Sequence, residues 1–126
     1  MKRDAADKWF SDVVRAKAAY TCENCHQKGR MECCHIFGRA AKSVRWSLDN
    51  AVCMCHSCHR KYTENPLEFT NWLETYLGKG YLEILREKWN VKMQTNKALR
   101  AEISKHYREE FKKMERDELY QPISYN

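Results

Sequence analysis

Residues 51–60 read AVCMCHSCHR, and this stretch holds more metal-binding side chains than a single ion can use. Five of its residues carry thiol or imidazole groups that commonly bind metals: Cys53, Cys55, His56, Cys58 and His59. A tetrahedral ion takes only four ligands, and so short a backbone cannot wrap all five around it. The stretch therefore raises two questions: which residues bind metal, and whether the metal serves structure or chemistry.

The spacing of the other cysteines answers the first question. Cys55 and Cys58 form a C-x-x-C knuckle, and an earlier knuckle at Cys22 and Cys25 precedes it by 29 intervening residues. Two such knuckles supply the four thiolates of a closed tetrahedral zinc site. We therefore expect a structural Zn²⁺ that adds folding free energy which a small core lacks. A ligand set in which His59 replaces one cysteine stays open.

Length and composition indicate a folded protein of 126 residues, expected to form one domain over 1–126. Hydrophobic residues make up 43% and charged residues 32% of the chain. The N-terminus MKRDAADKWF has no apolar segment typical of a secretion signal, and no apolar run approaches the ~18 residues that a membrane span needs. These features predict a cytoplasmic protein without a membrane partner. The odd number of cysteines, seven, also favours metal binding over disulfides in a reducing compartment.

The net charge of +6 is concentrated in the cysteine-rich half of the chain. Residues 1–65 hold 12 Lys and Arg against 7 Asp and Glu, whereas residues 66–126 hold 11 against 10. A basic surface of this kind favours a polyanionic partner, most often nucleic acid. The candidate DNA-binding residues are Arg39, Lys42, Arg45, Arg60 and Lys61.

Hydrophobic periodicity predicts an α+β, mostly helical chain. We expect an N-terminal helix within 1–20, a metal-binding core over 21–64, and a helical C-terminal part over 65–118. In the core, MECCHIF and AVCMC are apolar enough to pair as strands. Cys33, Cys34 and Cys53 would then be small buried side chains, and His26 and His56 exposed spacers.

The C-terminal part divides into three predicted helices. Asn65 and Glu68 suggest a capping box that opens a helix over 65–78, and a short helix follows at about 80–89. Thr95 is expected to cap a long helix over 95–118 with a narrow apolar stripe. That stripe would pack either on its own domain or on a second copy of the chain, which makes 95–118 a possible dimerisation helix.

Three further residues give these patterns a chemical meaning. His35, Asn50 and His59, together with the flanking C-x-x-C pairs, resemble the motif of the HNH, or ββα-metal, nucleases. The order of helix, knuckle, His, Arg45-Trp46, Asn50, knuckle and helices is similar to that of the phage lambda Rap (NinG) recombination endonucleases. The resemblance implies a zinc-bound ββα-metal core with an N-terminal helix and C-terminal helices.

The resemblance also implies a reaction. His35 would be the general base of phosphodiester hydrolysis, and Asn50 would hold the loop and, through a carbonyl, orient the His35 imidazole. His59 would bind a catalytic Mg²⁺ or Mn²⁺ at the scissile phosphate. The protein would be a metal-dependent DNA endonuclease, active as a homodimer on branched recombination intermediates such as D-loops and Holliday junctions. Its products would carry 5′-phosphate and 3′-hydroxyl ends.

One departure from the motif leaves alternatives open. Most members carry an acidic or imidazole metal ligand directly before the base, where this chain has Cys34. A thiolate is a poor ligand for Mg²⁺, so Glu32 or Asp49 would assist, or a softer ion such as Mn²⁺ would serve. The alternatives are a nonspecific HNH nicking nuclease and a non-catalytic zinc-finger DNA-binding protein. A thiol oxidoreductase would need a βαβ pattern that the sequence lacks.

Overall fold

The computed structural model describes residues 2–91 and 93–126. Met1, the first residue of the predicted segment 1–20, and residue 92 lie outside the described residues. Within them the chain forms five α-helices and one two-stranded antiparallel sheet, which confirms the prediction of a mostly helical α+β fold. None of the described helices has both the length and the apolar character needed to cross a membrane.

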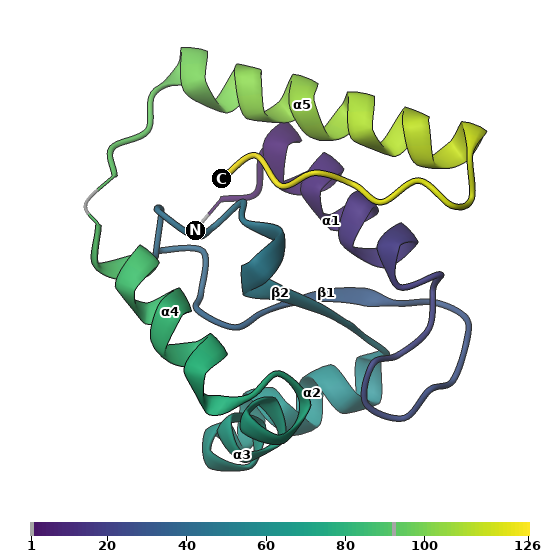
Figure 1. Cartoon of the computed structure of the whole chain (residues 1–126), viewed down its shortest axis with the longest axis vertical. Helices are drawn as coiled ribbons and strands as arrows, with labels where there is room; N and C mark the ends of the chain where they lie inside the picture. Colours follow the sequence, from purple (N-terminus) through teal and green to yellow (C-terminus); the bar gives the residue numbers. More distant parts are fainter. Residues whose placement is uncertain (1, 92) are drawn as a thin grey trace.

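The helices pack in layers around the small sheet (Figure 1). Helix α5 lies on α1, α1 packs against the sheet, and α2 contacts the sheet as well, with α3 and α4 following it. The bounds are α1 Ala5–Lys17, β1 Glu32–His35, the short 3₁₀ turn η1 Leu48–Asn50, β2 Ala51–Met54, α2 His56–Glu64, α3 Pro66–Tyr76, α4 Lys79–Asn90 and α5 Lys97–Arg116.

Helix α1 lies within the predicted segment 1–20 and is capped by Asp4. The Asp4 side chain accepts a hydrogen bond from the Asp7 backbone N–H at 3.1 Å, and the Asp7 side chain accepts one from the Asp4 N–H at 2.9 Å. This reciprocal capping box satisfies two backbone donors that a helix start leaves free. Phe10 and Val13 are fully buried on its apolar face. Each such side chain stabilises the fold by roughly 1.5–3 kcal/mol.

Helix α5 packs on its own chain. Ile103 and Tyr107 are fully buried, and the Tyr107 ring meets the Phe10 ring of α1 edge-on at 5.2 Å. The centre of the apolar stripe predicted for 95–118 is therefore covered by α1. The cap of the helix also lies one residue later than predicted, because Asn96 rather than Thr95 accepts from the Leu99 N–H at 2.8 Å.

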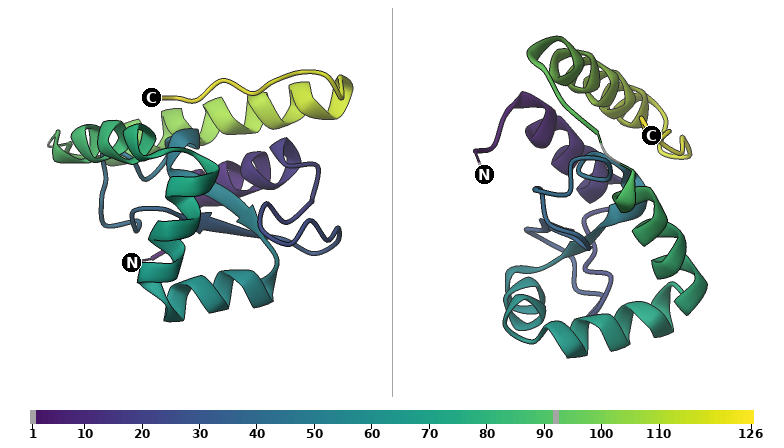
Figure 2. Two further views of the ribbon diagram at one scale, coloured as in Figure 1. Left: turned by 60° about the horizontal axis from the view of Figure 1, so that its bottom comes forward. Right: turned by 90° about the vertical axis from the view of Figure 1, so that its left-hand side faces the viewer.

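A C-terminal tail follows α5 and runs back along it (Figures 1 and 2). The Tyr125 N–H donates to the Tyr107 hydroxyl at 3.0 Å, and the Asn126 side-chain amide donates to the Ser43 carbonyl at 2.8 Å. The Ser124 hydroxyl accepts from the Leu48 N–H at 3.0 Å. The tail thus binds the loop between the two strands to the helical layer, a contact that no pattern in the sequence predicted.

Helix α3 confirms its predicted position but not its predicted cap. Asn65 stands at the N-cap, yet its side chain makes no capping hydrogen bond and instead donates to the Lys61 carbonyl at 2.8 Å. The capping box that we expected from Asn65 and Glu68 is therefore wrong. The Asn65 side-chain amide thus binds the last turn of α2 instead of the first turn of α3. Pro66 starts α3, and because proline has no backbone N–H, this position needs no capping partner.

The sheet pairs Cys33 with Cys53 and His35 with Ala51. Successive side chains of a strand point to opposite faces, so Cys33 and His35 share one face of β1, and Glu32 and Cys34 share the other. His35 stacks on Phe10 of α1, with ring centroids 5.6 Å apart, and Glu32 contacts His59 of α2 at 2.8 Å. The face of β1 with His35 therefore meets α1, and Glu32 on the opposite face meets α2.

A buried ion pair joins α1 to the loop between the strands. Arg45 is only 5% exposed and Asp7 only 4%, and the Arg45 Nε donates to the Asp7 carboxylate at 3.0 Å. The Trp46 indole N–H donates to the same carboxylate at 3.1 Å. Burial alone would raise the pKa of Asp7, but the hydrogen bonds from Arg45 and Asp4 outweigh it and hold the pKa below its usual value. Arg45, which the sequence predicted as a DNA contact, is buried here and its guanidinium donates to Asp7.

Replacing Asp7 by Asn is expected to destabilise the fold by about 3–5 kcal/mol, because it leaves the Arg45 charge buried without a counter-charge. Denaturant unfolding would measure the loss. Since the pKa of Asp7 is lowered on folding, its stabilisation is complete above its unfolded value of about 3.9 and is lost as the pH falls through the folded value.

The control is Glu64→Gln, which breaks the exposed pair of Glu64 with Arg60. Exposed pairs contribute about 0–1 kcal/mol, so this variant should unfold close to wild type. Equal, small effects of both substitutions would contradict the structural role given to Asp7.

Candidate metal centre and hydrolytic site

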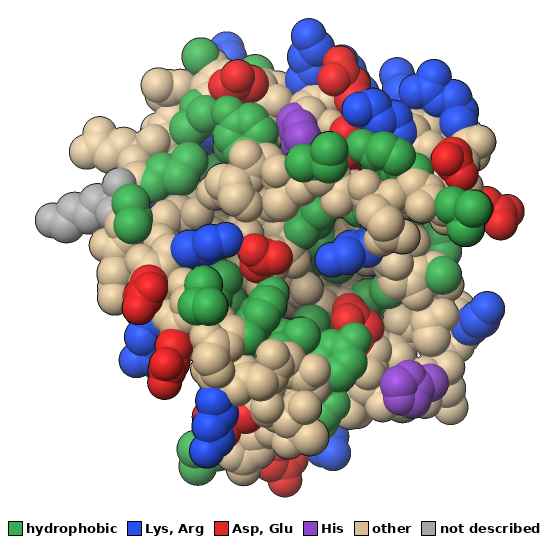
Figure 3. Space-filling view, in the orientation of Figure 1, with side chains coloured by type: hydrophobic (Ala, Val, Ile, Leu, Met, Phe, Trp, Pro, Cys, Tyr) green, Lys and Arg blue, Asp and Glu red, His purple; other side chains and the backbone are tan. Residues whose placement is uncertain are grey.

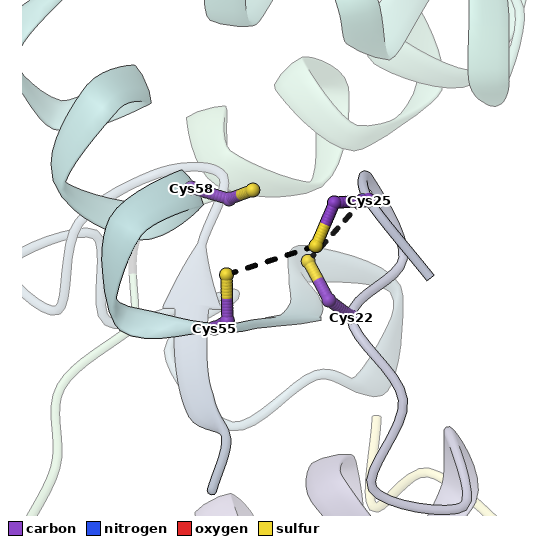
Figure 4. Close-up of side chains that lie close together, drawn as sticks. All are labelled: Cys22, Cys25, Cys55 and Cys58. Atoms are coloured by element: carbon purple, nitrogen blue, oxygen red, sulfur yellow. Dashed lines mark hydrogen bonds between the residues drawn. The ribbon is translucent and has the colours of Figure 1, made fainter. Parts of the chain in front are cut away.

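The two knuckles converge on one point (Figure 4). The sulfur atoms of Cys22, Cys25, Cys55 and Cys58 all lie within 4.8 Å of one another. Four thiolates at such distances form the donor set that zinc prefers, and they leave no open position for a substrate. The predicted four-cysteine cluster is therefore present and could hold a metal such as Zn²⁺. The cluster forms without His59, so the alternative with an idle cysteine finds no support in it.

The first knuckle is shaped by its own backbone. The Cys22 N–H donates to the Gln27 carbonyl and the His26 N–H to the Cys22 carbonyl, both at 2.9 Å. His26 adopts a left-handed conformation with φ of 65°, which turns the chain tightly after Cys25. As predicted, His26 is exposed and stands outside the cluster.

Polar groups around the cluster suit thiolates. Burial would raise the pKa of the Cys22 thiol, but the backbone N–H groups of Cys25, Cys55 and Asn24 lower it to about 7. The Asn24 side-chain amide donates to the Cys58 sulfur at 3.3 Å, and the Tyr62 hydroxyl donates to the other end of that amide at 3.2 Å. Donors to sulfur stabilise the negative charge of a metal-bound thiolate, so the residues present fit a zinc site.

His35 is mostly buried and is held at one ring nitrogen. Its Nε2 lies 3.1 Å from the Arg45 backbone carbonyl. Because a carbonyl only accepts, Nε2 carries the proton, and the lone pair of the neutral ring is on Nδ1. Burial lowers the pKa of His35 below its ordinary value of 6.5, so the ring is neutral and basic at pH 7.

Asn50 holds the loop that follows His35. It is fully buried; its side-chain amide donates to the Phe37 carbonyl at 2.8 Å, and its oxygen accepts from the Phe37 N–H at 2.8 Å. The loop-holding role therefore agrees with the prediction. The carbonyl that orients the His35 ring, however, belongs to Arg45 rather than to Asn50, and Arg45 is fixed in turn by Asp7.

His59 lies in the first turns of α2 against an acidic residue of β1. Its Nδ1 is 2.8 Å from one Glu32 oxygen, and the Nδ1 of His56 is 3.1 Å from the other. The hydrogen bond from His59, opposed by burial, lowers the pKa of Glu32, which is therefore a carboxylate at neutral pH. Of the two acids considered as helpers, Glu32 is beside His59, whereas Asp49 is exposed and bridges to Lys88 at 3.0 Å.

A cavity of about 580 Å³ is lined by both histidines, and we call it the His35–His59 cavity. Four arginines from three segments line it with them: Arg3 and Arg15 from the N-terminal region, Arg30 before β1, and Arg39 after it. Only Arg39 was predicted as a DNA contact. The i, i+4, i+8 spacing of Asp7, Ser11 and Arg15 on one face of α1 is the signal that could have identified this wall.

The other predicted DNA contacts lie elsewhere. Arg60 is exposed and pairs with Glu64 at 3.1 Å, and Lys61 is exposed over the Tyr62 ring. Lys42 is exposed on the loop after Gly38, near Trp89 of α4. None of these three lines the His35–His59 cavity.

The three remaining cysteines are unreactive thiols. Burial is the largest effect on each and raises the pKa of Cys33, Cys34 and Cys53 to about 12. Cys34 and Cys53 are buried as predicted, whereas Cys33 is half-buried. Protonated thiols are poor nucleophiles and poor ligands, which argues against thiol chemistry at these positions.

Comparisons with family models, with curated proteins and with solved structures found no match to this chain.

Proposed function

We propose that the protein is a metal-dependent DNA endonuclease that hydrolyses phosphodiesters with His35 as general base. The observation that carries the proposal is the His35–His59 cavity, which is lined by a neutral imidazole, a second imidazole and four arginines. The strand, strand and helix order of β1, β2 and α2 supports an HNH-type core around them. The four-cysteine cluster, with its structural Zn²⁺, would fix the start of α2 and with it the position of His59.

The chain's own residues supply most of the chemistry. His35 Nδ1 would take the proton of the attacking water while Nε2 stays hydrogen-bonded to the Arg45 carbonyl. Asn50 would fix the loop at Phe37, directly after His35, and Asp7 would fix it at Arg45, whose carbonyl orients the ring. The arginines would neutralise the phosphate as charge develops on it. A divalent ion held at His59 would stabilise the leaving oxygen, and His59 with the Glu32 carboxylate beside it fits such an ion.

Branched DNA is the substrate that we propose, on the resemblance to the recombination endonucleases. On the face shown in Figure 3, Lys and Arg gather mainly over α5 and elsewhere alternate with Asp and Glu. That face offers no continuous basic track for a long duplex. A compact cavity with four arginines suits a few closely spaced phosphates instead, such as those at a strand junction.

A cleavage assay tests the proposal. Zinc-loaded protein is incubated with a four-way junction, a D-loop and linear duplex DNA, with Mg²⁺, with Mn²⁺ or with neither. Omitting the divalent ion is the sharper control, because a chelator also competes for the structural zinc. We expect ion-dependent cutting of the branched substrates. Equal cutting of all three substrates would favour a nonspecific nicking nuclease, and tight binding without cutting under either ion would favour a non-catalytic zinc-finger protein.

Replacing Arg30 by Gln is expected to weaken DNA binding and to lower its salt dependence. Arg30 is exposed and lines the His35–His59 cavity, so its loss removes one phosphate contact. The slope of log affinity against log salt should fall by about 0.9. Arg60→Gln removes the same charge outside the cavity and should leave affinity and slope near wild type. Equal effects of the two variants would contradict the assignment of the cavity as the DNA site.

A further inference from the structure

We propose that one side of α5 binds a short stretch of the phosphate backbone of a DNA duplex that leads away from the His35–His59 cavity. This inference rests on the proposed function, because it assigns a second contact surface for the same substrate. Lys and Arg side chains gather over α5 on the side of the molecule shown in Figure 3. Five basic residues of the helix form the surface that we call the α5 basic face: Lys97, Arg100, Lys105, Arg108 and Lys112.

Helical spacing places these five side chains on one side of α5. Each of them lies three or four residues from another, and Arg100 and Arg108 are eight residues apart, so the α5 basic face is continuous along the helix. The opposite side carries the buried Ile103, which packs toward α1. The C-terminal tail lies along a third side, where the Tyr125 hydroxyl donates to Glu102 at 2.9 Å. The α5 basic face is therefore left open to solvent.

Most of the charge on this face is not neutralised by the described part of the chain. Of its five members only Arg100 forms an ion pair with a described residue, from its Nε to the Asp4 carboxylate at 3.4 Å. Elsewhere on the surface a basic residue of a helix has its acid, as Arg60 has Glu64 at 3.1 Å. Like charges three or four residues apart on a helix repel one another. An anionic ligand would remove this repulsion.

A groove of about 410 Å³ lies between the α5 basic face and the start of α1. All members of the face except Lys112 line it, and Asp4 is the one acid among the described residues of its wall. The small side chains of Ala101 and Ser104 also line the groove, so a sugar–phosphate strand can approach the helix closely. Serine hydroxyls and basic side chains are common donors to phosphate oxygens.

The groove adjoins the His35–His59 cavity at the N-terminal segment. Arg3 lines the cavity, and its chain neighbour Asp4 lines the groove. Consecutive Cα atoms are about 3.8 Å apart, so the two hollows share a rim at this point. The segment is held in place by Arg45, whose guanidinium donates to the Lys2 carbonyl at 3.3 Å. A DNA strand that leaves the cavity over Arg3 therefore meets the α5 basic face next.

The dimensions and composition of the face favour DNA over other anions. From Lys97 to Lys112 the helix rises by about 22 Å, and one DNA strand has a phosphate about every 3.4 Å along its axis. The face therefore matches several successive phosphates rather than a single small anion. A helix that binds a lipid surface turns an apolar side to it, but the apolar side of α5 is buried against α1.

The experiment measures DNA binding without cleavage. Zinc-loaded protein is titrated into a fluorescently labelled four-way junction without added Mg²⁺ or Mn²⁺, and fluorescence anisotropy gives the affinity at several salt concentrations. The double variant Lys105→Gln/Arg108→Gln removes two exposed cations of the α5 basic face. Because each lost phosphate contact lowers the slope of log affinity against log salt by about 0.9, the slope should fall by about 1.8. The affinity should fall by at least about tenfold.

The matched control is the double variant Lys79→Gln/Arg86→Gln on α4. It also removes one exposed Lys and one exposed Arg from a helix, but neither residue lines the groove or the cavity. We expect this variant to bind DNA with the affinity and salt dependence of the wild type. Glutamine is a good helix former, so both double variants should fold, and zinc content and circular dichroism would confirm it.

The outcomes separate this inference from the proposed function. Wild-type affinity and slope in Lys105→Gln/Arg108→Gln would overturn the α5 basic face as a DNA surface and favour an acidic protein as its partner. Equal losses in the two double variants would also overturn it, because net charge alone would then explain them. A loss confined to the α5 variant, with no cleavage of any DNA by the wild type, would support the face and contradict the nuclease. Ion-dependent cleavage by the wild type, with unchanged binding by the α5 variant, would support the nuclease and contradict the face.

Discussion

Cys58→Ser is expected to lose the structural zinc and to unfold the region between the two knuckles. The substitution removes one of four thiolates that lie within 4.8 Å of one another. Structural zinc binds zinc-finger peptides with apparent free energies of about 10–16 kcal/mol at pH 7, while whole domains are stable by only about 5–15 kcal/mol. Loss of even a part of the zinc-binding energy is therefore comparable to the total stability of the fold.

The damage should spread through defined contacts. The Glu23 N–H, between the cysteines of the first knuckle, donates to the Cys53 carbonyl of β2 at 2.9 Å, and Cys55 starts α2. Releasing the knuckles therefore frees the outer edge of β2 and the start of α2. Metal analysis should give one zinc per chain for the wild type and almost none for the variant, and thermal unfolding followed by circular dichroism should show the loss of stability.

Cys33→Ser is the matched control for this prediction. Cys33 is on β1, outside the four-cysteine cluster, and the same change of thiol to hydroxyl is made there. We expect it to keep its zinc and most of its stability. A Cys58→Ser protein with one zinc per chain and an unchanged melting temperature would exclude the four-cysteine assignment.

The four-cysteine cluster and the mostly helical α+β fold could be predicted because both depend on local patterns. C-x-x-C spacing reports a tight turn with two convergent thiols, and the helical periodicities report buried faces. The buried pair of Asp7 and Arg45 could not be predicted, because its members are 38 positions apart and each has a plausible local role. Asp7 is a helix-capping residue, and Arg45 looks like a basic loop residue.

The candidate hydrolytic site was predictable only in part, for the same reason. The motif identified His35, Asn50 and His59, which are fixed in order along the chain. Of the arginines of the cavity wall, Arg3 and Arg15 belong to the N-terminal region and Arg30 and Arg39 flank β1. Only the packing of α1 on β1 places them around one cavity. The carbonyl that orients His35 was assigned to Asn50, because the sequence does not show which part of a 14-residue loop turns back to the imidazole; the contact comes from Arg45.

His35→Ala is expected to reduce DNA cleavage by about 10²–10⁴-fold, the usual contribution of a general base. Zinc content and DNA affinity should stay near wild type, because His35 belongs neither to the four-cysteine cluster nor to the arginine wall. Single-turnover rates on a four-way junction, with binding measured separately, would show the difference. The Gln side chain of His35→Gln fills the space beside Phe10 better than Ala does, but it is not a base. This variant should therefore be as inactive as His35→Ala, which separates loss of the base from loss of packing.

The pH dependence gives the same prediction a second readout. Burial lowers the pKa of His35 below 6.5, so the basic neutral form is already dominant at pH 7. The wild-type rate should rise tenfold per pH unit below the pKa and stay level from pH 7 upward, and the residual rate of His35→Ala should lack this step.

Added imidazole should restore part of the activity of the alanine variant, because the cavity of about 580 Å³ can admit it. His106→Ala, on α5, removes an imidazole outside the cavity and should cleave as the wild type does. An active His35→Ala protein with an unchanged pH profile would show that another group takes the proton.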